Sequence, residues 1–277
     1  MSDAIVPLKK VRWSALSHLG HFRKNNEDSF LGLTFDGKES LYLGKSGENS
    51  LNGQDFVFAV SDGMGGANAG EFASKIVIEK TMKLLPKGFR SRASGMESGF
   101  QDLFEELFLE SHKALCYLGA CYPECAQMGC TLSLCWMTPD WLYFGHIGDS
   151  RIYYFPAKGG IKQVTHDDSH VGWLLRTGKI TEREARNHPR KNALQKALGA
   201  GHQFVDPQVG AIGHESGDIF LICSDGLTDG LWDKHLLELI REPNLEQQAI
   251  APANRLIEES LKNSGRDNTT AVVLEIL

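Results

Sequence analysis

The stretch that decides the fold is residues 56–66, which read FVFAVSDGMGG. Five apolar residues, most of them strand formers, lead into Ser61 and Asp62, and three glycines follow within four residues. This order predicts a β-strand that ends on a carboxylate and opens into a loop with accessible backbone. An Asp-Gly pair alone is an ordinary turn signal, so the interpretation depends on support from elsewhere in the chain.

The same pattern recurs in residues 219–226, which read IFLICSDG. Asp225, like Asp62, follows an apolar run and a serine and precedes a glycine. Two further carboxylates lie in short loop-like signatures, Asp149 in Gly-Asp-Ser-Arg and Asp267 in Asp-Asn-Thr-Thr. An Asx-capped turn is the alternative interpretation of Asp267. Strands that each end on a carboxylate collect negative charge in one place, which is stable only with a hard cation bound. The pattern therefore predicts a metal enzyme.

A cation and two carboxylates lie close together near the N-terminus, in RKNNED at residues 23–28. Arg23 precedes Glu27 by four residues and Asp28 by five. A surface salt-bridge cluster is one interpretation. In the other, Arg23 holds a phosphate, because its planar guanidinium binds two phosphate oxygens at once.

Composition limits the class of protein. The 277 residues, 42% hydrophobic and 23% charged, are typical of a globular chain, and the absence of repeats or a long linker favours one domain over 1–277. A net charge of -6 gives no basic field for nucleic acid. Residues 1–10 lack the apolar core of a signal peptide, and no run approaches the roughly 18 apolar residues that span a bilayer. We expect a cytoplasmic protein with no membrane partner.

Six cysteines raise the alternative of a zinc site. Five of them are spaced four or five residues apart and form no C-x-x-C pair, which favours reduced, partly buried thiols. The cysteines are Cys116, Cys121, Cys125, Cys130, Cys135 and Cys223.

Strand-like and helical patterns occur in separate groups. Strands are predicted at 11–18, 28–35, 56–61, 131–137, 141–147, 151–155, 218–224 and 270–276, and helices at 69–85, 96–118 and 245–263. Short connections such as Thr138-Pro139-Asp140 favour antiparallel pairing, with a tight bend at Gly148-Asp149. Pro86 is expected to end the first helix. Residues 36–54 are expected to extend a hairpin or loop, and 167–192 to hold short helical pieces. The grouping indicates an α+β layered domain.

Taken in order, these motifs resemble the metal-dependent serine/threonine protein phosphatases of the protein phosphatase 2C type. The resemblance runs from about Trp13 to Leu274. It implies two packed antiparallel β-sheets flanked by helix pairs, an α-β-β-α sandwich with the metal centre at one edge. The motifs that carry it are Arg23 with Asn26-Glu27-Asp28, Asp62-Gly63-Met64-Gly65-Gly66, Gly129-Cys130-Thr131, Gly148-Asp149-Ser150-Arg151, Ser224-Asp225-Gly226 and Asp267-Asn268.

The resemblance also implies a role for each carboxylate. Asp62 would bridge two Mn²⁺ or Mg²⁺ ions, with the Gly63 carbonyl on one ion and Asp225 and Asp267 on the other. Asp149 would bind a third, weaker ion that it shares with Asp225.

Around that centre, Glu27 and Asp28 would hold metal-bound waters, and Arg23 the substrate phosphate, with Asn268 nearby. Oxygen donors without His or Cys suit Mg²⁺ or Mn²⁺ rather than zinc. The implied reaction is hydrolysis of phosphoserine and phosphothreonine by a hydroxide that bridges the ions, so no protein nucleophile is required. The implied partners are phosphorylated proteins made by a serine/threonine kinase, and we expect a monomeric, signalling phosphatase.

Two departures from the family pattern concern substrate chemistry. Met64 stands where many eukaryotic members have a proposed general acid, His. A thioether cannot donate a proton, so metal-bound water must do so or leaving groups of low pKa will be favoured. Met is common in bacterial members at this place, and we expect a bacterial source.

The second departure is Asp167-Asp168-Ser169, where the family pattern has Asp-His-Ser. His166 and His170 flank the motif as candidate substitutes, although an exposed loop histidine is more often inert. The segment from about 167 to 198 resembles a flap that varies with substrate in this family.

Two alternative functions stay open. One is a non-catalytic module that binds phosphoproteins on the same scaffold, which the complete set of carboxylates disfavours. The other is a hydrolase of small phosphate esters or anhydrides, which would share the chemistry and differ in the pocket.

Overall fold

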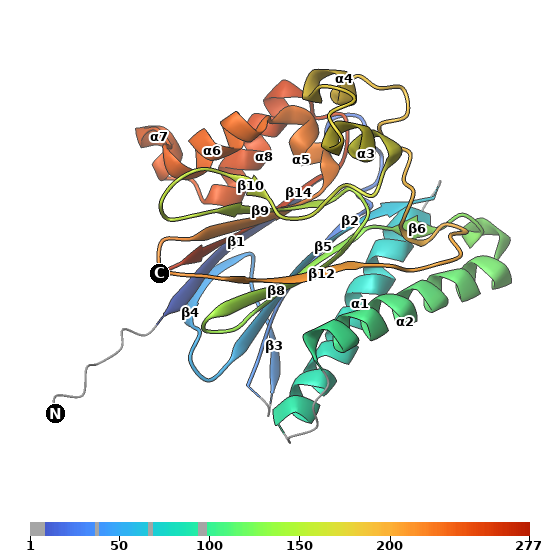
Figure 1. Cartoon of the computed structure of the whole chain (residues 1–277), viewed down its shortest axis with the longest axis horizontal. Helices are drawn as coiled ribbons and strands as arrows, with labels where there is room; N and C mark the ends of the chain where they lie inside the picture. The colour runs from blue at the N-terminus through green and yellow to red at the C-terminus, as the bar shows by residue number, and fades with distance from the viewer. Residues whose placement is uncertain (1–8, 37–38, 66–68, 94–98) are drawn as a thin grey trace.

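The computed structural model describes residues 9–36, 39–65, 69–93 and 99–277. Gly66, the start of the expected helix 96–118 and most of the N-terminal segment 1–10 lie outside these ranges. Two antiparallel sheets pack face to face, with helices on both outer faces (Figure 1), which confirms the α-β-β-α sandwich. Among the described residues, no helix is both long and apolar enough to cross a bilayer.

The first sheet has six strands within the described residues. Their order is β10 (Lys162–Gln163), β9 (Arg151–Phe155), β13 (Ile219–Cys223), β14 (Thr269–Ile276), β1 (Lys10–His18) and β4 (Ser46–Ser50). The outer face of this sheet is covered by α5 (Asp225–Gly230), α6 (Asp233–Arg241) and α8 (Pro252–Asn263), while the short α7 (Leu245–Gln248) has no buried residue.

The second sheet has eight strands in the same described part of the chain. Its main path is β11 (Leu198–Gly199), β6 (Gly129–Cys130), β5 (Asp55–Met64), β7 (Leu132–Met137), β8 (Trp141–Ile147) and β12 (Gln208–Gly213). On the other side of β5 lies β2 (Asp28–Phe35), which also pairs with β3 (Ser40–Tyr42). The covering helices are α1 (Ala69–Ala93) and α2 (Phe100–Cys121), followed by the 3₁₀ turn η1 (Pro123–Cys125).

Alternation along the strands produces three apolar layers. In β5, for example, Phe56 and Phe58 face the layer between the sheets, and Val57 and Ala59 face the helices α1 and α2. Both faces of β5 are buried, one against the other sheet and one against α1 and α2, so residues on both faces are apolar. This packing fixes the register and therefore the edge at which each strand ends.

Two expectations about chain path were wrong, and a third was incomplete. Pro86 does not end α1, which runs to Ala93, because the packing of the buried Leu85 offsets the one amide donor that proline lacks. The expected helix 245–263 is two helices, since Pro252 begins α8. Residues 36–54 extend a hairpin as expected, since β3 turns back on β2, but β4 then pairs with β1 in the other sheet.

Other local predictions are confirmed. The amide of Thr138 donates to the Trp141 carbonyl at 2.9 Å and closes the β7–β8 hairpin. The bend at Gly148, with φ of 110°, carries the chain from β8 in one sheet to β9 in the other. The six cysteines are free thiols, three of them buried.

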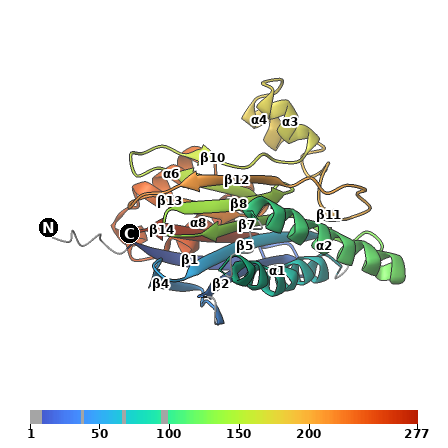
Figure 2. The ribbon, with the colours of Figure 1, turned by 60° about the horizontal axis from the view of Figure 1, so that its bottom comes forward.

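Two short helices form the segment that resembles a flap, α3 (His170–Arg176) and α4 (Glu182–Arg186). Figure 2 shows them projecting from the sandwich, above the end of the molecule where β11 lies. Here "the flap" means residues 167–198.

Candidate metal centre and catalytic pocket

Both sheets bring carboxylates to one edge of the sandwich. Asp28 and Asp62 face each other as neighbours in the β2–β5 ladder. Asp225 follows β13 and begins α5, Asp267 precedes β14, and Asp149 lies in the crossing from β8 to β9. Strand ends that are far apart in the sequence therefore meet at one place.

A cavity of about 490 Å³ opens at that edge. It brings together eight of the residues expected at the site, and it adds six others. The lining residues are Arg23, Lys24, Asn25, Glu27, Asp62, Gly63, Met64, Gly65, Thr131, Asp149, Asn192, Leu194, Asp225 and Asp267. Asp28 and Asn268, the other two expected residues, are buried and contact the loops that line the cavity.

Asp28 has one satisfied and one unsatisfied carboxylate oxygen. Its Oδ2 accepts hydrogen bonds from the hydroxyls of Ser224, at 2.7 Å, and Thr270, at 2.6 Å. Its Oδ1 is buried without a hydrogen-bond partner among the described residues. Burial raises the pKa of this carboxyl to about 6. A buried carboxylate oxygen that lacks a donor is suited to a cation or to a water held by one.

The remaining carboxylates also destabilise one another's charged forms. Burial, and then the charge of Asp28, raises the pKa of Asp62 well above its ordinary value. Burial and the charge of Asp149 do the same to the pKa of Asp225, and the pKa of Asp149 is raised to about 7, chiefly by burial. Such a cluster favours bound cations, which would offset both the burial and the repulsion.

The donors fit a hard divalent cation but form no closed cage. In the described part of the chain, no three His, Cys, Asp or Glu side chains converge as a tight metal site. The carboxylates instead line one cavity from several directions. The side chains expected as ligands offer oxygen only, which suits Mg²⁺ or Mn²⁺ better than zinc.

The backbone at Asp62 and Gly63 is closely packed against neighbouring segments. The Asp62 amide donates to the Thr131 hydroxyl at 3.0 Å, and the Thr131 amide donates to the Asp62 carbonyl at 2.8 Å. A Cβ at Gly63 would lie 2.0 Å from the Gly70 carbonyl oxygen and 2.8 Å from that of Glu27. Glycine is therefore required at this strand end, where the chain enters the cavity.

Arg23 lines the cavity and pairs with two carboxylates. Its Nη2 donates to Asp267 Oδ2 at 2.7 Å, and its Nη1 lies 3.8 Å from Glu27 Oε2. The hydrogen bond that Arg23 donates to Asp267 raises the pKa of the guanidinium, which stays charged. The side chain is 46% exposed and lines the cavity, so it is both paired and accessible to an anion.

Asn268 ties the loop between β1 and β2 to the start of β14. Its Oδ1 accepts from the Glu27 amide at 2.8 Å, and its Nδ2 donates to the carbonyls of Leu19, at 2.8 Å, and Asn25, at 3.0 Å. Asn268, the neighbour of Asp267 in the sequence, thus holds the loop that carries Arg23.

The Asp-Asp-Ser departure has a structural explanation. Arg151 binds both oxygens of Asp167, at 2.9 and 2.7 Å. Asp168 pairs with Gly148 in both directions: its amide donates to the Gly148 carbonyl at 2.7 Å, and its Oδ2 accepts from the Gly148 amide at 3.1 Å. His166 and His170 are exposed and lie outside the lining of the cavity.

Asn192 and Leu194 were not expected at the site. They come from the segment that was expected to resemble a flap, but no local pattern marks these two residues within it. Thr131 was expected only to lie near the site at the start of a strand, and its hydroxyl in fact holds the Asp62 amide.

Comparison with known proteins now decides the family. The family model described as protein phosphatase 2C matches residues 46–263. The chain belongs to the protein phosphatase 2C family. It is 33% identical over 272 residues to the serine/threonine protein phosphatase PstP of Mycobacterium tuberculosis, covering 96% of this chain and 45% of that protein. The chain thus spans about half the length of the mycobacterial relative.

A second relative matches almost end to end. The serine/threonine phosphatase stp of Listeria monocytogenes is 30% identical over 262 residues, which cover 92% of each protein.

Solved structures share the fold. A crystal structure of the PstP catalytic domain in complex with two manganese ions has a TM-score of 0.73 at 32% identity, covering 97% of this chain and 99% of that one. The Streptococcus agalactiae serine/threonine phosphatase has a TM-score of 0.75 at 26% identity, covering 96% and 99%.

Proposed function

We propose that this protein is a metal-dependent phosphoprotein phosphatase that hydrolyses phosphoserine and phosphothreonine. The observation that carries the proposal is the cavity in which carboxylates from both sheets raise one another's pKa beside an accessible arginine. Its relatives are serine/threonine phosphatases, and one of them binds two manganese ions in its catalytic domain, which supports the same chemistry here.

In this proposal two Mn²⁺ or Mg²⁺ ions are held by Asp62, the Gly63 carbonyl, Asp225 and Asp267. When bound, the ions supply Lewis-acid activation of water and of the phosphoryl group at neutral pH. A third, weaker ion would share Asp225 with Asp149.

The protein's own residues position the substrate. Glu27 and Asp28 would accept hydrogen bonds from water in the ion shell, and the free Oδ1 of Asp28 suits that role. Arg23 would hold phosphoryl oxygens with its planar fork while Asp267 fixes its orientation. Met64 lines the cavity without a titratable proton, so either water in the ion shell would protonate the leaving alkoxide or leaving groups of low pKa would be favoured.

The proposal also covers the location, oligomeric state and signalling role of the protein. We place the protein in the cytoplasm as a monomer that reverses a serine/threonine kinase in signalling. Free thiols, three of them exposed or half-buried, are compatible with a reducing compartment.

The test is hydrolysis of p-nitrophenyl phosphate against a Mn²⁺ titration, with EDTA as a control. Its leaving group has a low pKa, so the assay does not depend on a proton donor at position 64. We expect Asp62→Asn to lower kcat at least about 100-fold, because it removes a carboxylate from the centre of the cluster. The variant should also lose most of the rise in Tm that Mn²⁺ gives the wild type.

Asp140→Asn is the matched control, because its carboxylate is 77% exposed and lies outside the cavity. Full activity in Asp62→Asn would refute the metal assignment. A wild type that binds Mn²⁺ without turnover would favour the phosphoprotein-binding module. Comparison of phosphopeptides with phosphorylated metabolites separates the protein phosphatase from a small-ester hydrolase.

A further inference from the structure

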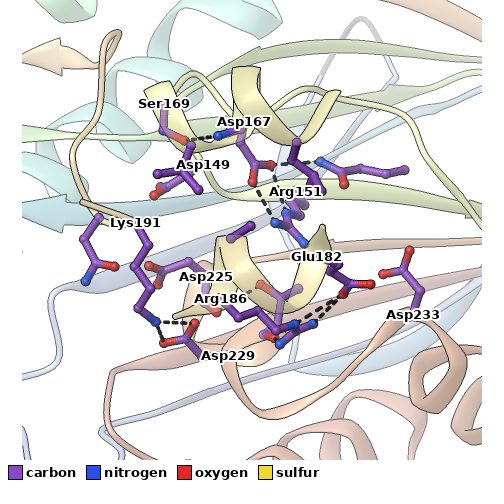
Figure 3. Close-up of a pocket in the computed structure, with 17 residues that line it drawn as sticks. Asp149, Arg151, Asp167, Ser169, Glu182, Arg186, Lys191, Asp225, Asp229 and Asp233 are labelled. Carbon is purple, nitrogen blue, oxygen red and sulfur yellow. Dashed lines mark hydrogen bonds and ion pairs between the residues drawn. The ribbon is translucent and has the colours of Figure 1, made fainter. Parts of the chain in front are cut away.

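A second cavity lies between the flap and the body of the protein (Figure 3). It measures about 210 Å³, and its lining shares Asp149, Asn192 and Asp225 with the catalytic pocket. α3 and α4 form one wall of this cavity and α5 forms another. The distance between the flap helices and α5 therefore sets the width of the cavity.

The base of the flap is closed on itself. Ser169 and Leu194 form an isolated antiparallel bridge, and the Gln195 amide donates to the Asp168 carbonyl at 2.7 Å. The chain therefore leaves the body and returns to it at one place. Contacts farther out on the flap must decide how close its helices stand to α5.

Arg186 of α4 makes such a contact with the carboxyl end of α5. Its guanidinium donates to the carbonyls of Thr228 and, at 2.9 Å, Leu231. It also lies 4.1 Å from the centre of the Trp232 ring and pairs with Glu182 of its own helix. A cation at the carboxyl end of a helix satisfies carbonyls that have no partner within the helix and interacts favourably with the helix dipole.

A second cation of the flap reaches the same helix. The Lys191 ammonium contacts both carboxylate oxygens of Asp229, at 2.7 and 2.6 Å. Lys191 is followed directly by Asn192, which lines both cavities, and Asp229 lies one helical turn after Asp225. The flap is thus joined to the helix that begins with a carboxylate of the catalytic pocket.

We propose that Arg186 is a positioning residue that latches the flap onto α5 and so sets the selectivity for phosphorylated polypeptides over small phosphate esters. The inference rests on the proposed function. A small ester needs only Arg23 and the carboxylates of the pocket. A polypeptide must also pass Asn192, which lines both cavities and directly follows Lys191, the flap residue paired with Asp229 of α5.

The first measurement is kcat and KM of Arg186→Met on a short phosphothreonine peptide and on p-nitrophenyl phosphate. The variant loses the hydrogen bonds from the Arg186 guanidinium to the Thr228 and Leu231 carbonyls. Because the flap is then held less firmly against α5, we expect KM for the peptide to rise about fivefold or more. Both constants for p-nitrophenyl phosphate should stay within about twofold of wild type. Arg186→Lys should recover only part of the effect, since an ammonium cannot replace a planar fork stacked on an indole.

The second measurement does not depend on activity. Trp173 in α3 is 39% exposed, so chymotrypsin can report opening of the flap. We expect cleavage after Trp173 to be about tenfold faster in Arg186→Met, with the Tm of the whole protein little changed. Arg183→Met is the matched control, because Arg183 is an exposed arginine in the same helix that is not part of the cavity lining.

Equal losses on both substrates, no change on either, or unchanged cleavage after Trp173 would each overturn the latch. A wild type that hydrolyses neither substrate would refute the proposed function itself, and the proteolysis result would then show whether Arg186 holds the flap.

Discussion

At the scale of single residues, crowding around the cavity is as informative as charge. Gly63 has no room for a side chain, because a Cβ would collide with the Gly70 and Glu27 carbonyls. The sequence showed the glycine and its neighbour Asp62, but a turn signal was an equally good explanation. The packing of α1 against the end of β5 excludes that explanation, since the constraint is the approach of Gly70.

Gly63→Ala should therefore be costly. We expect a loss of about 1–3 kcal/mol in the free energy of unfolding, from forced displacement of the Gly70 backbone, with a fall in activity. Urea denaturation measures the first effect and p-nitrophenyl phosphate hydrolysis the second. Gly44→Ala is the control: its Cβ would lie 3.8 Å from the nearest atom, and the expected change is within about 0.5 kcal/mol. Similar values for the two variants would contradict the crowding argument.

At the scale of elements, apolar alternation predicted many of the strands well, and helical spacing of apolar residues predicted some of the helices. β2 and β8 begin and end where the pattern placed them. β12 was missed because Gln208–Gly213 is half-exposed and contains two glycines, which weaken any strand signal. α5 and α6 were missed because each is short and follows directly on a strand or turn, where the apolar period is too brief to detect.

The loop between β1 and β2 depends on Asn268, which precedes β14. Asn268→Ala removes three hydrogen bonds at a buried position and leaves the Glu27 amide without its acceptor. We expect a loss of about 1–3 kcal/mol in the free energy of unfolding and a higher KM for phosphate esters, because Arg23 is less well placed. Thermal unfolding and Michaelis kinetics test this. Asn52→Ala, at an exposed turn, should change neither, and an unchanged KM in Asn268→Ala would show that the loop is held by other contacts.

At the scale of the whole molecule, the acidic edge between the sheets destabilises the metal-free fold. The pKa values of Asp28 and Asp149 are raised to about 6 and about 7. Between the ordinary aspartate pKa near 4 and these values, the folded state binds more protons than the unfolded state. The contribution of these two carboxyls to the free energy of unfolding therefore falls as pH rises through this window.

We predict that, in EDTA, Tm decreases from about pH 5 to about pH 8, and that saturating Mn²⁺ removes most of the decrease because cations favour the ionised carboxylates. Asp149→Asn should be more stable than wild type at the upper end of this range without metal. Scanning calorimetry over pH, with and without Mn²⁺, provides the measurement. A metal-free Tm difference between Asp149→Asn and wild type that stays constant over the same range would show that the pKa of Asp149 is not raised.

The sequence by itself determined which strands carry Asp62 and Asp225 near their ends, the oxygen-only set of donors, and the two-layer α+β class. These follow from local alternation and from the chemistry of side chains, which each segment carries wherever it folds. Only the tertiary structure decided that β8 and β9 join different sheets, that β4 pairs with β1, and that Asn192 of the flap reaches the pocket. A period of two records which face of a strand is buried but not which strand lies beside it, because that choice depends on packing between distant segments.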